Sequence, residues 1–449
     1  MIPISDVRKV SGGVAKTKVT SAKPKGQSVF GDASPAAAMV SALLADAVAA
    51  GASAVHIEPH SVAASIRYRI DGLLHEGKPV PADALKNLTK RFKQLANLDV
   101  SESRLPQDGR FDATFAKRPY IVRVSVLPVT DGEKIVAHIA EQTGVGHDLE
   151  KLGYWGQTLQ VMREATDTAR GLVLVGGPAG TGKTSTLYGL LSLAAKPSLS
   201  IATVEDVIEH RLTGVTQTVV HSKTNNATFA NTLRAVLRQD PNVVMVSDIH
   251  EPDTASQALH AALGGHLVLA GLQSRDLAAS LAHLAAMHVE PYVIATAIRA
   301  LANQRLVRRL CPNCRQSYTP SASEFDALCK AAGLPVGGVR AHLTNLQSIA
   351  AADLQVAPAT LAGSKVTLWR ANEKGCEQCG SRGYKGRIVI VEAMAVSPAI
   401  QRLLMSNAHG GALYTQAMQD GMVPLPLDGL VKVVLGLTSV EEVLQALQK

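Results

Sequence analysis

The sequence predicts an α/β protein in which a smaller α+β domain precedes a domain built on a parallel sheet. Between residues 171 and 270, short apolar runs alternate with helical segments, the pattern of a parallel sheet covered by helices. Between residues 54 and 140, apolar and polar side chains alternate, as in half-buried strands. The length of 449 residues exceeds that of one domain and fits about two to four.

The smaller domain is expected at residues 35–143, after a basic tail at 1–34. The tail has no clear period and is either a disordered, solvated leader or a tether to acidic lipid or a partner. Ser34 and Pro35 begin a helix that stops at Gly51. The other expected elements are strands at 54–58, 65–70, 111–114, 120–127 and 134–140, a helix at 85–98, a hairpin turn at Asp71-Gly72 and a polar loop at 104–110.

Residues 144–156 are the expected joint to the larger domain, which we place at 157–310. It should open with a helix at 157–165 and contain strands at 172–175, 200–204, 243–246 and 267–270. Residues 311–390 carry two pairs of cysteines around an alanine-rich insert that is expected to be helical. The remaining residues, 391–449, are also expected to be helical.

Composition restricts the location and the partners of the chain. No apolar run has the length of about 20 residues that spans a bilayer. The basic N-terminus is followed by no apolar stretch, so we expect no secretory signal and a cytoplasmic protein. The net charge of +8 permits an acidic partner, such as nucleic acid or an anionic membrane. Aromatic residues are only 4%, which leaves few surfaces for base stacking, and we expect no nucleic acid.

A glycine-rich motif follows the strand at 172–175 and precedes a helix. It matches G-x-x-x-x-G-K-[ST], whose glycines let backbone N–H groups surround phosphate oxygens at a helix N-terminus. Lys183 should reach the β- and γ-phosphates, and the Thr184 hydroxyl should ligate Mg²⁺. A turn that binds nothing is the alternative, which the flanking strand and helix disfavour. The predicted nucleotide-binding residues are Gly177, Pro178, Ala179, Gly180, Thr181, Gly182, Lys183, Thr184 and Ser185.

Acidic residues end two of the later strands. Asp248 is placed to hold Mg²⁺ through water, and Glu205 to polarise an attacking water. Gln273 follows the next strand and is placed to contact the γ-phosphate and report its loss. Acids also occur at sheet edges without any role, but the neighbouring phosphate loop favours a functional one.

Three arginines of the first domain allow two interpretations. Arg104, Arg110 and Arg123 are either solvated surface residues or a charge clamp on the triphosphate, reached across a domain or subunit gap. The residues alone do not decide between these.

Two C-x-x-C pairs predict a structural metal site. Cys311, Cys314, Cys376 and Cys379 offer four thiolates, a set that suits tetrahedral Zn²⁺ and leaves no open position. A redox role is the alternative, and the presence of two pairs favours metal. Cys329 is expected to be a small apolar residue.

Together these motifs resemble the secretion ATPases of the type II secretion and type IV pilus assembly family, from about residue 34 to the C-terminus. The tetracysteine element is similar to that of the assembly-type members. The resemblance rests on the motifs at residues 53–59, 67–72, 104–110, 177–185, 203–206, 237–241, 265–269, 304–311 and 383–387.

This resemblance implies a RecA-like motor domain behind a PAS-like domain, and a homo-hexamer that uses ATP, Mg²⁺ and Zn²⁺. Such rings lie at the cytoplasmic face of the inner membrane, on a platform protein, and drive pilin subunits into a filament. By the same resemblance, Glu205 matches the acid of the Asp box, Asp248 the Walker B glutamate and Gln273 a histidine. Arg104, Arg110 and Arg123 match arginines that complete the site.

The chain departs from the family pattern at its site. Asp248 is one methylene shorter than glutamate, and a misplacement near ~1 Å can cost on the order of 10²-fold in rate. Gln273 donates a hydrogen bond but carries no charge. Ala54 replaces an Asp, His138 replaces an Arg, and His250-Glu251 replaces Arg-Asp. These changes predict an ATPase of reduced turnover, or one that depends on a second motor ATPase. A non-hydrolysing ATP-binding subunit of a mixed ring is the alternative, and a nucleic-acid translocase is disfavoured.

Overall fold

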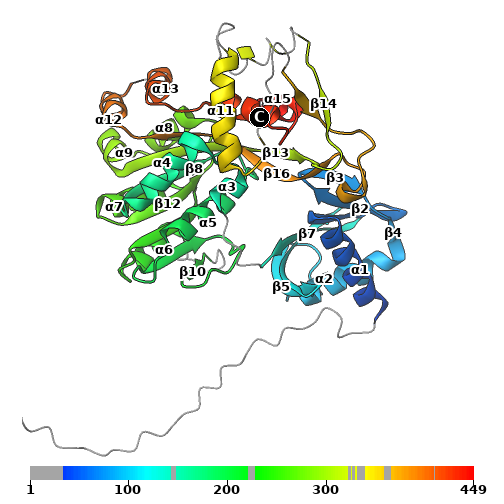
Figure 1. The fold of residues 1–449 in the computed structure, drawn as a ribbon. Coiled ribbons are helices and arrows are strands. Elements are labelled where there is room, and N and C mark those ends of the chain that lie inside the picture. Colours follow the sequence, from blue (N-terminus) through cyan, green and yellow to red (C-terminus); the bar gives the residue numbers. More distant parts are fainter. Residues whose placement is uncertain are drawn as a thin grey trace, which may run out of the picture.

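A computed structural model describes residues 34–142, 148–220, 228–321, 325, 329–330, 339–357, 366–408 and 410–448. Two sheets with their helices form two domains, which confirms the predicted α/β class (Figure 1). The basic tail up to residue 33, part of the joint and parts of the alanine-rich insert lie outside the described residues.

The first domain is an antiparallel sheet with two helices packed together. Its strand order is β3-β2-β1-β7-β6-β5, and β4 pairs with β2. Apolar residues of both helices and of the sheet share one core, in which Leu44, Phe92 and Val122 are fully buried. The elements are α1 (Pro35–Ala49), β1 (Ala52–Glu58), β2 (Ala63–Ile70), β3 (Leu73–Glu76), β4 (Val80–Pro81), α2 (Ala82–Leu95), β5 (Gln107–Phe115), β6 (Arg118–Val129) and β7 (Gly132–Glu141).

Two local predictions in this domain have different outcomes. The turn at Asp71-Gly72 joins β2 to β3, with φ of 49° and 90°, the left-handed values that a tight hairpin requires. The predicted polar loop at 104–110 is wrong in its second half, because Gln107 to Arg110 pair with β6 as part of β5. β5 is an edge strand with one exposed face. Its exposed polar residues therefore gave the segment the composition of a loop.

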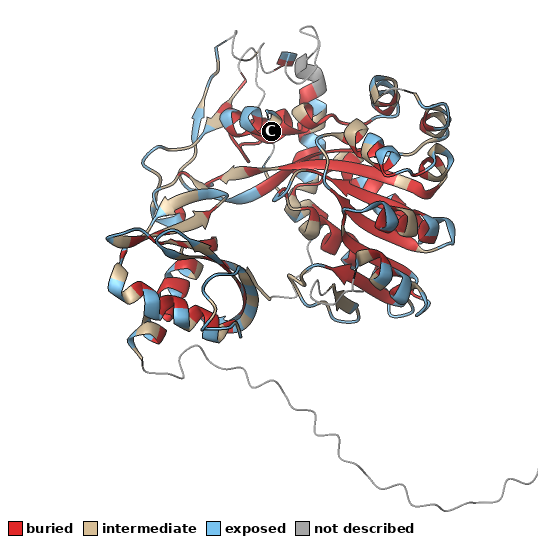
Figure 2. Ribbon diagram, turned by 180° about the vertical axis from the view of Figure 1, so that it is seen from behind, coloured by how far each residue is buried: buried red, intermediate tan, exposed pale blue. Residues whose placement is uncertain are grey.

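The second domain is a seven-stranded sheet of order β10-β9-β11-β12-β8-β13-β16. The described pairs are parallel except for β13 and β16. Its strands are β8 (Gly171–Gly176), β9 (Ile201–Glu205), β10 (Thr216–Val219), β11 (Val243–Ile249), β12 (Leu267–Leu272), β13 (Ile298–Leu310) and β16 (Tyr384–Ala395). The central strands are buried between helices (Figure 2).

Alternation along β8 shows how the sheet is covered. Leu172 and Leu174 pack on one side, in a core that includes residues of α6 to α9, α12 and α13. Val173 and Val175 pack on the other side, against α4 and α5. These helices are α4 (Gly156–Asp167), α5 (Lys183–Ala194), α6 (Phe229–Leu237), α7 (Pro252–Leu263), α8 (Leu277–Ala286), α9 (Pro291–Ala297), α12 (Pro398–Met405) and α13 (Gly410–Gln419).

The sequence analysis missed the two strands at one end of this sheet. β13 pairs with β8 on one side and with β16 on the other. Since β16 follows the last cysteine in the chain, the sheet extends into the region that we expected to hold the zinc element and C-terminal helices. Polar residues within β13, such as Asn303 and Gln304, concealed its apolar pattern.

The remaining elements surround β13 and β16. The short sheet of β14 (Gln316–Tyr318) and β15 (Leu368–Arg370) lies beside the cysteines. α11, α14 and α15 share a core with Ile388 and Ile390 of β16. Cys329 is buried in the same core, as expected of a small apolar residue. The bounds are α3 (Leu149–Leu152), α11 (Val339–Asp353), the 3₁₀ helix η1 (Glu377–Cys379), α14 (Leu425–Val434) and α15 (Val440–Leu447).

Candidate nucleotide and metal sites

The glycine-rich loop connects the end of β8 to the start of α5. Gly177, Gly180 and Gly182 have φ of 150°, 75° and 87°, conformations that L side chains rarely adopt. A Cβ on Gly177 would lie 2.8 Å from the Gln304 carbonyl oxygen. The loop therefore lies directly against β13, and glycine is required at this approach.

Lys183 is folded back onto the loop. Its Nζ donates to the carbonyl oxygens of Gly177 at 3.0 Å and of Pro178 at 3.4 Å. Burial lowers the pKa of Lys183, and the Asp248 carboxylate opposes this effect. Thr184 and Lys183 line a cavity of about 660 Å³. The residue predicted to ligate Mg²⁺ and the residue predicted to bind phosphate therefore border the same cavity.

Asp248, on β11, lines the same cavity and pairs with Lys183. Its Oδ2 lies 3.6 Å from Lys183 Nζ and 3.8 Å from His250 Nε2. Gln273 Nε2 donates to the same oxygen at 3.4 Å. Asp248 Oδ1 is buried and has no hydrogen-bond partner in the described part of the chain. A buried carboxylate oxygen without a donor is costly, and a hydrated cation would satisfy it.

Glu205 lies behind the cavity and does not line it. It is fully buried and accepts hydrogen bonds from the Tyr188 hydroxyl, from Thr203 Oγ1 at 2.6 Å and from Gln217 Nε2 at 3.1 Å. Burial raises the pKa of Glu205. Its in-strand position at the end of β9 turns the side chain into the protein.

Asp206 and Glu209 line the cavity instead. Asp206 is the first residue after β9, and Ser247 Oγ donates to its Oδ1 at 3.3 Å. Burial raises the pKa of Glu209, while the Arg123 guanidinium opposes that rise. The sequence analysis selected Glu205, the last residue of β9, and did not select Asp206. The position of Asp206 immediately after the strand is the signal that could have identified it.

The arginines of the first domain do not line this cavity. The Arg104 side chain is 88% exposed and pairs with Glu102. Arg110 and Arg123 lie opposite each other on β5 and β6, and both are exposed. The Arg123 guanidinium only opposes the rise that burial causes in the pKa of Glu209.

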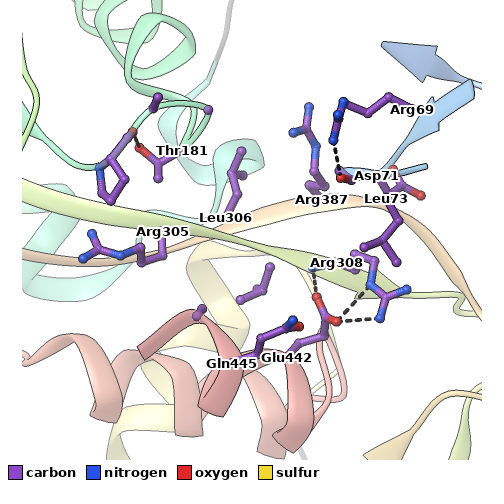
Figure 3. Close-up of a pocket in the computed structure, with 16 residues that line it drawn as sticks. Arg69, Asp71, Leu73, Thr181, Arg305, Leu306, Arg308, Arg387, Glu442 and Gln445 are labelled. Carbon is purple, nitrogen blue, oxygen red and sulfur yellow. Dashed lines mark hydrogen bonds and ion pairs between the residues drawn. The ribbon is translucent and has the colours of Figure 1, made fainter. Parts of the chain in front are cut away.

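Other arginines lie closer to the glycine-rich loop. A second cavity of about 350 Å³ adjoins the first and shares Asp71, Ala179, Gly180, Leu306 and Arg387 with it. Arg69 and Arg387 lie near the Asp71 turn (Figure 3). Arg308 pairs with Glu442 at 2.6 Å. Arg69 and Arg387 stand in motifs noted from the sequence, but no pattern within those motifs predicted their approach to the loop.

The predicted zinc ligands come together in space. The Sγ atoms of Cys311, Cys314, Cys376 and Cys379 all lie within 4.8 Å of one another. Three of the Sγ pairs are 3.7, 3.8 and 3.9 Å apart, and four ligands at the usual Zn–S length are about 3.8 Å apart in a tetrahedron. This spacing fits a Zn²⁺ ion.

Without a cation, these four thiols do not ionise alike. Burial raises the pKa of Cys314 to about 12, whereas the Asn313 side-chain amide lowers the pKa of Cys376 to about 6. Thiols this crowded resist becoming four thiolates together, and a divalent cation removes that penalty.

The parallel sheet, the glycine-rich loop and the opposed Lys183 and Asp248 define a P-loop nucleotide-binding protein. The family model described as "Type II/IV secretion system protein" matches residues 30–445. The chain belongs to this family, as the resemblance of its motifs predicted.

Three relatives illustrate the match. The chain is 34% identical to the type IV pilus assembly ATPase PilB of Myxococcus xanthus over 414 residues, covering 92% of this chain and 68% of that protein. It is 36% identical to the type II secretion system protein E of Klebsiella pneumoniae over 418 residues, covering 93% and 77%. Its fold resembles the ATPase DotB of Legionella pneumophila with a TM-score of 0.61 at 17% identity, covering 91% and 95%.

None of the helices in the described residues is long and apolar enough to cross a membrane.

Proposed function

We propose that this protein is an ATPase that drives assembly of a type IV pilus or of a type II secretion pseudopilus. One observation carries the proposal: Lys183 and Asp248 form an ion pair at 3.6 Å, and both line one cavity together with residues of the glycine-rich loop. The names of the relatives support an ATPase of this kind.

Each residue around the cavity has a role in this proposal. The backbone N–H groups of residues 177 and 179–185 and the Lys183 ammonium hold the phosphates. Thr184 and Asp248 would hold Mg²⁺, which would supply positive charge to neutralise the charge that develops on the phosphates. Gln273 contacts the terminal phosphate and links it to Asp248. Arg104, Arg110 and Arg123 complete the site once the first domain closes or a neighbouring subunit approaches.

The second cavity suits the nucleoside. It adjoins the loop, is about 350 Å³ in volume and contains Leu73 and Leu306 as apolar surface beside Asp71 and Arg387. Apolar walls with a few polar groups are typical of ligand sites. The base and ribose therefore lie between the Asp71 turn and β13.

The quaternary proposal follows the resemblance. A PAS-like first domain and a RecA-like motor domain form a homo-hexameric ring at the cytoplasmic face of the inner membrane. The ring acts on a platform protein, with no nucleic acid involved, and Zn²⁺ at the four cysteines is structural. We retain the domain limits 1–34, 35–143, 144–156, 157–310, 311–390 and 391–449 as predictions, although β16 shows the motor sheet reaching Ala395.

A second function, a non-hydrolysing ATP-binding subunit of a mixed ring, is favoured by the position of Glu205. It is fully buried and accepts from three donors, so it can polarise water only after a rearrangement. Turnover is expected to be low for this reason and because Asp248 is short. Either a second motor ATPase shares the work or this chain turns over slowly.

Phosphate release from Mg-ATP by the purified full-length protein tests the proposal. Lys183→Ala should lower the rate by about 10²-fold or more, because one cation on the developing charge is lost. Lys196→Ala, at an exposed position after α5, is the matched control. Equal rates for both variants would contradict the assignment. A large gain from Asp248→Glu would show that the natural chain is held at low turnover.

A further inference from the structure

Gln304 is a buried polar residue in β13 that no step above uses. It is fully buried, and the three side-chain hydrogen bonds that it makes with described residues all reach outside β13. Its Nε2 donates to the Thr181 carbonyl oxygen at 2.8 Å. Its Oε1 accepts from Thr186 Oγ1 at 2.9 Å and from the Tyr154 hydroxyl at 2.7 Å. One side chain therefore joins the glycine-rich loop, helix α5 and the segment before α4.

The contact with Thr181 sets the orientation of the loop. A trans peptide is planar, with its C=O and N–H on opposite sides. A Thr181 carbonyl held by Gln304 therefore turns the N–H of Gly182 away from β13, and Gly182 and Lys183 line the cavity. A Cβ on Gly182 would lie 3.4 Å from Gln304 Nε2, so the amide of Gln304 packs directly against the loop. Preorganised N–H groups are what phosphate binding requires.

The contact with Tyr154 leads away from the nucleotide. Tyr154 lies where the chain enters the second domain, after α3, and is fully buried. Gly153 before it has φ of 117°, and a Cβ there would lie 2.9 Å from the Val389 carbonyl oxygen. Trp155 after it is 1% exposed and donates from Nε1 to Asp428 of α14. This segment is thus fixed between the loop network and the C-terminal helices.

We propose that Gln304 is a positioning residue for the glycine-rich loop, and that Tyr154 transmits nucleotide binding from Gln304 to the Tyr154–Trp155 segment at the domain entrance. The inference rests on the proposed ATP site. A ligand shifts such a segment only if it binds its two arrangements with different affinity. The Gln304 side-chain amide connects the two parts, because its Nε2 donates to the loop at Thr181 and its Oε1 accepts from Tyr154.

Trp155 provides a direct readout. The chain has two tryptophans, and Trp369 lies under the Arg315 guanidinium at 4.3 Å. Trp369→Phe keeps an aromatic ring for that contact and leaves Trp155 as the only tryptophan. In this background, ADP titration measures affinity by calorimetry and the response of the segment by Trp155 emission.

Gln304→Leu tests the positioning role. It leaves the Thr181 carbonyl without its donor and should weaken ADP binding by about tenfold or more. If this variant does not fold, Gln304→Glu replaces it, because it keeps the two acceptor contacts. The introduced carboxyl group cannot donate to Thr181 when ionised but can when protonated, so the affinity of this variant relative to wild type should recover as pH falls. A purely structural role would give no such recovery.

Tyr154→Phe tests the transmission. It removes one hydroxyl and leaves Gln304 bonded to Thr181 and Thr186, so ADP affinity should stay within about threefold of wild type. The Trp155 emission change on ADP binding should fall to less than half. Tyr414→Phe is the matched control, since it removes a hydroxyl from a Glu392 contact at 3.4 Å that does not involve the Gln304 side chain, and it should keep the full change.

The outcomes separate the two proposals. A wild-type protein that binds no adenine nucleotide overturns the proposed function. A wild-type protein that binds ADP, with Gln304 variants of equal affinity, overturns the positioning role. An unchanged emission response in Tyr154→Phe, or no response in the wild type, overturns the transmission.

Discussion

Two lysine–aspartate pairs in this protein illustrate opposite uses of the same chemistry. Asp428 and Lys432 are both 0% exposed and 2.6 Å apart, and every charged oxygen has a donor: Lys432 and the Val391 N–H on Oδ2, and Trp155 on Oδ1. Lys183 and Asp248 are 8% and 16% exposed and 3.6 Å apart. Asp248 Oδ1 has no partner among the described residues.

The difference separates a structural pair from a pair prepared for a ligand. A buried pair must have all its atoms satisfied, because desolvation otherwise exceeds the Coulombic gain. Asp428 and Lys432 meet that requirement by binding α14 to β16 and to Trp155. The pair of Lys183 and Asp248 leaves one carboxylate oxygen without a partner among the described residues. This pair lines the cavity where phosphates and Mg²⁺ would bind. The first pair should therefore determine stability, and the second should determine activity.

The largest expected effect comes from breaking the structural pair. Lys432→Met leaves Asp428 buried and unpaired, which should lower the free energy of unfolding by about 3–5 kcal/mol. Urea unfolding measures this, with Lys196→Met as an exposed control that should cost less than about 0.5 kcal/mol. A Lys432→Met protein as stable as wild type would show that Asp428 and Lys432 do not form a structural pair.

The second effect comes from the pair at the cavity. Asp248→Asn removes the charge that holds Mg²⁺ and should lower phosphate release by about 10²-fold, with an equal or higher free energy of unfolding. Steady-state rates and urea unfolding on the same preparation measure both quantities. If the rate and the stability fell together, the contrast between the two pairs would be lost.

The smallest effect concerns Glu205 and sharpens the comparison, since this acid is buried and forms no ion pair with any residue that the structure describes. Burial raises its pKa, so the folded state holds the proton more tightly than the unfolded state does. Stability from this group is therefore fully present below the pKa that Glu205 has in the unfolded state, and it is lost as pH rises through the higher pKa of the folded state. Glu205→Gln does not titrate, so its unfolding free energy minus that of wild type should increase as pH rises from about 4.5 to about 7.5. A pH-independent difference would contradict the shift.

Local patterns in the sequence determined much of the fold and the site. The strand, loop and helix around Lys183 follow from an apolar run, obligatory glycines and a helix start, all adjacent in the chain. The cysteine pairs and the Asp71-Gly72 turn follow equally from spacing of a few residues. Such features depend on backbone conformations that neighbouring residues dictate, and so they can be read from the sequence.

Only the tertiary structure decided the long-range partners. That β16 closes the sheet beside β13, that Gln304 lies under the loop, and that Asp206 lines the cavity while Glu205 is buried depend on residues far apart in the chain. Side chains alternate along a strand, so a shift of β9 by one residue would turn Glu205 toward the cavity and Asp206 away from it. No local pattern fixes that register, since the packing of the whole sheet does.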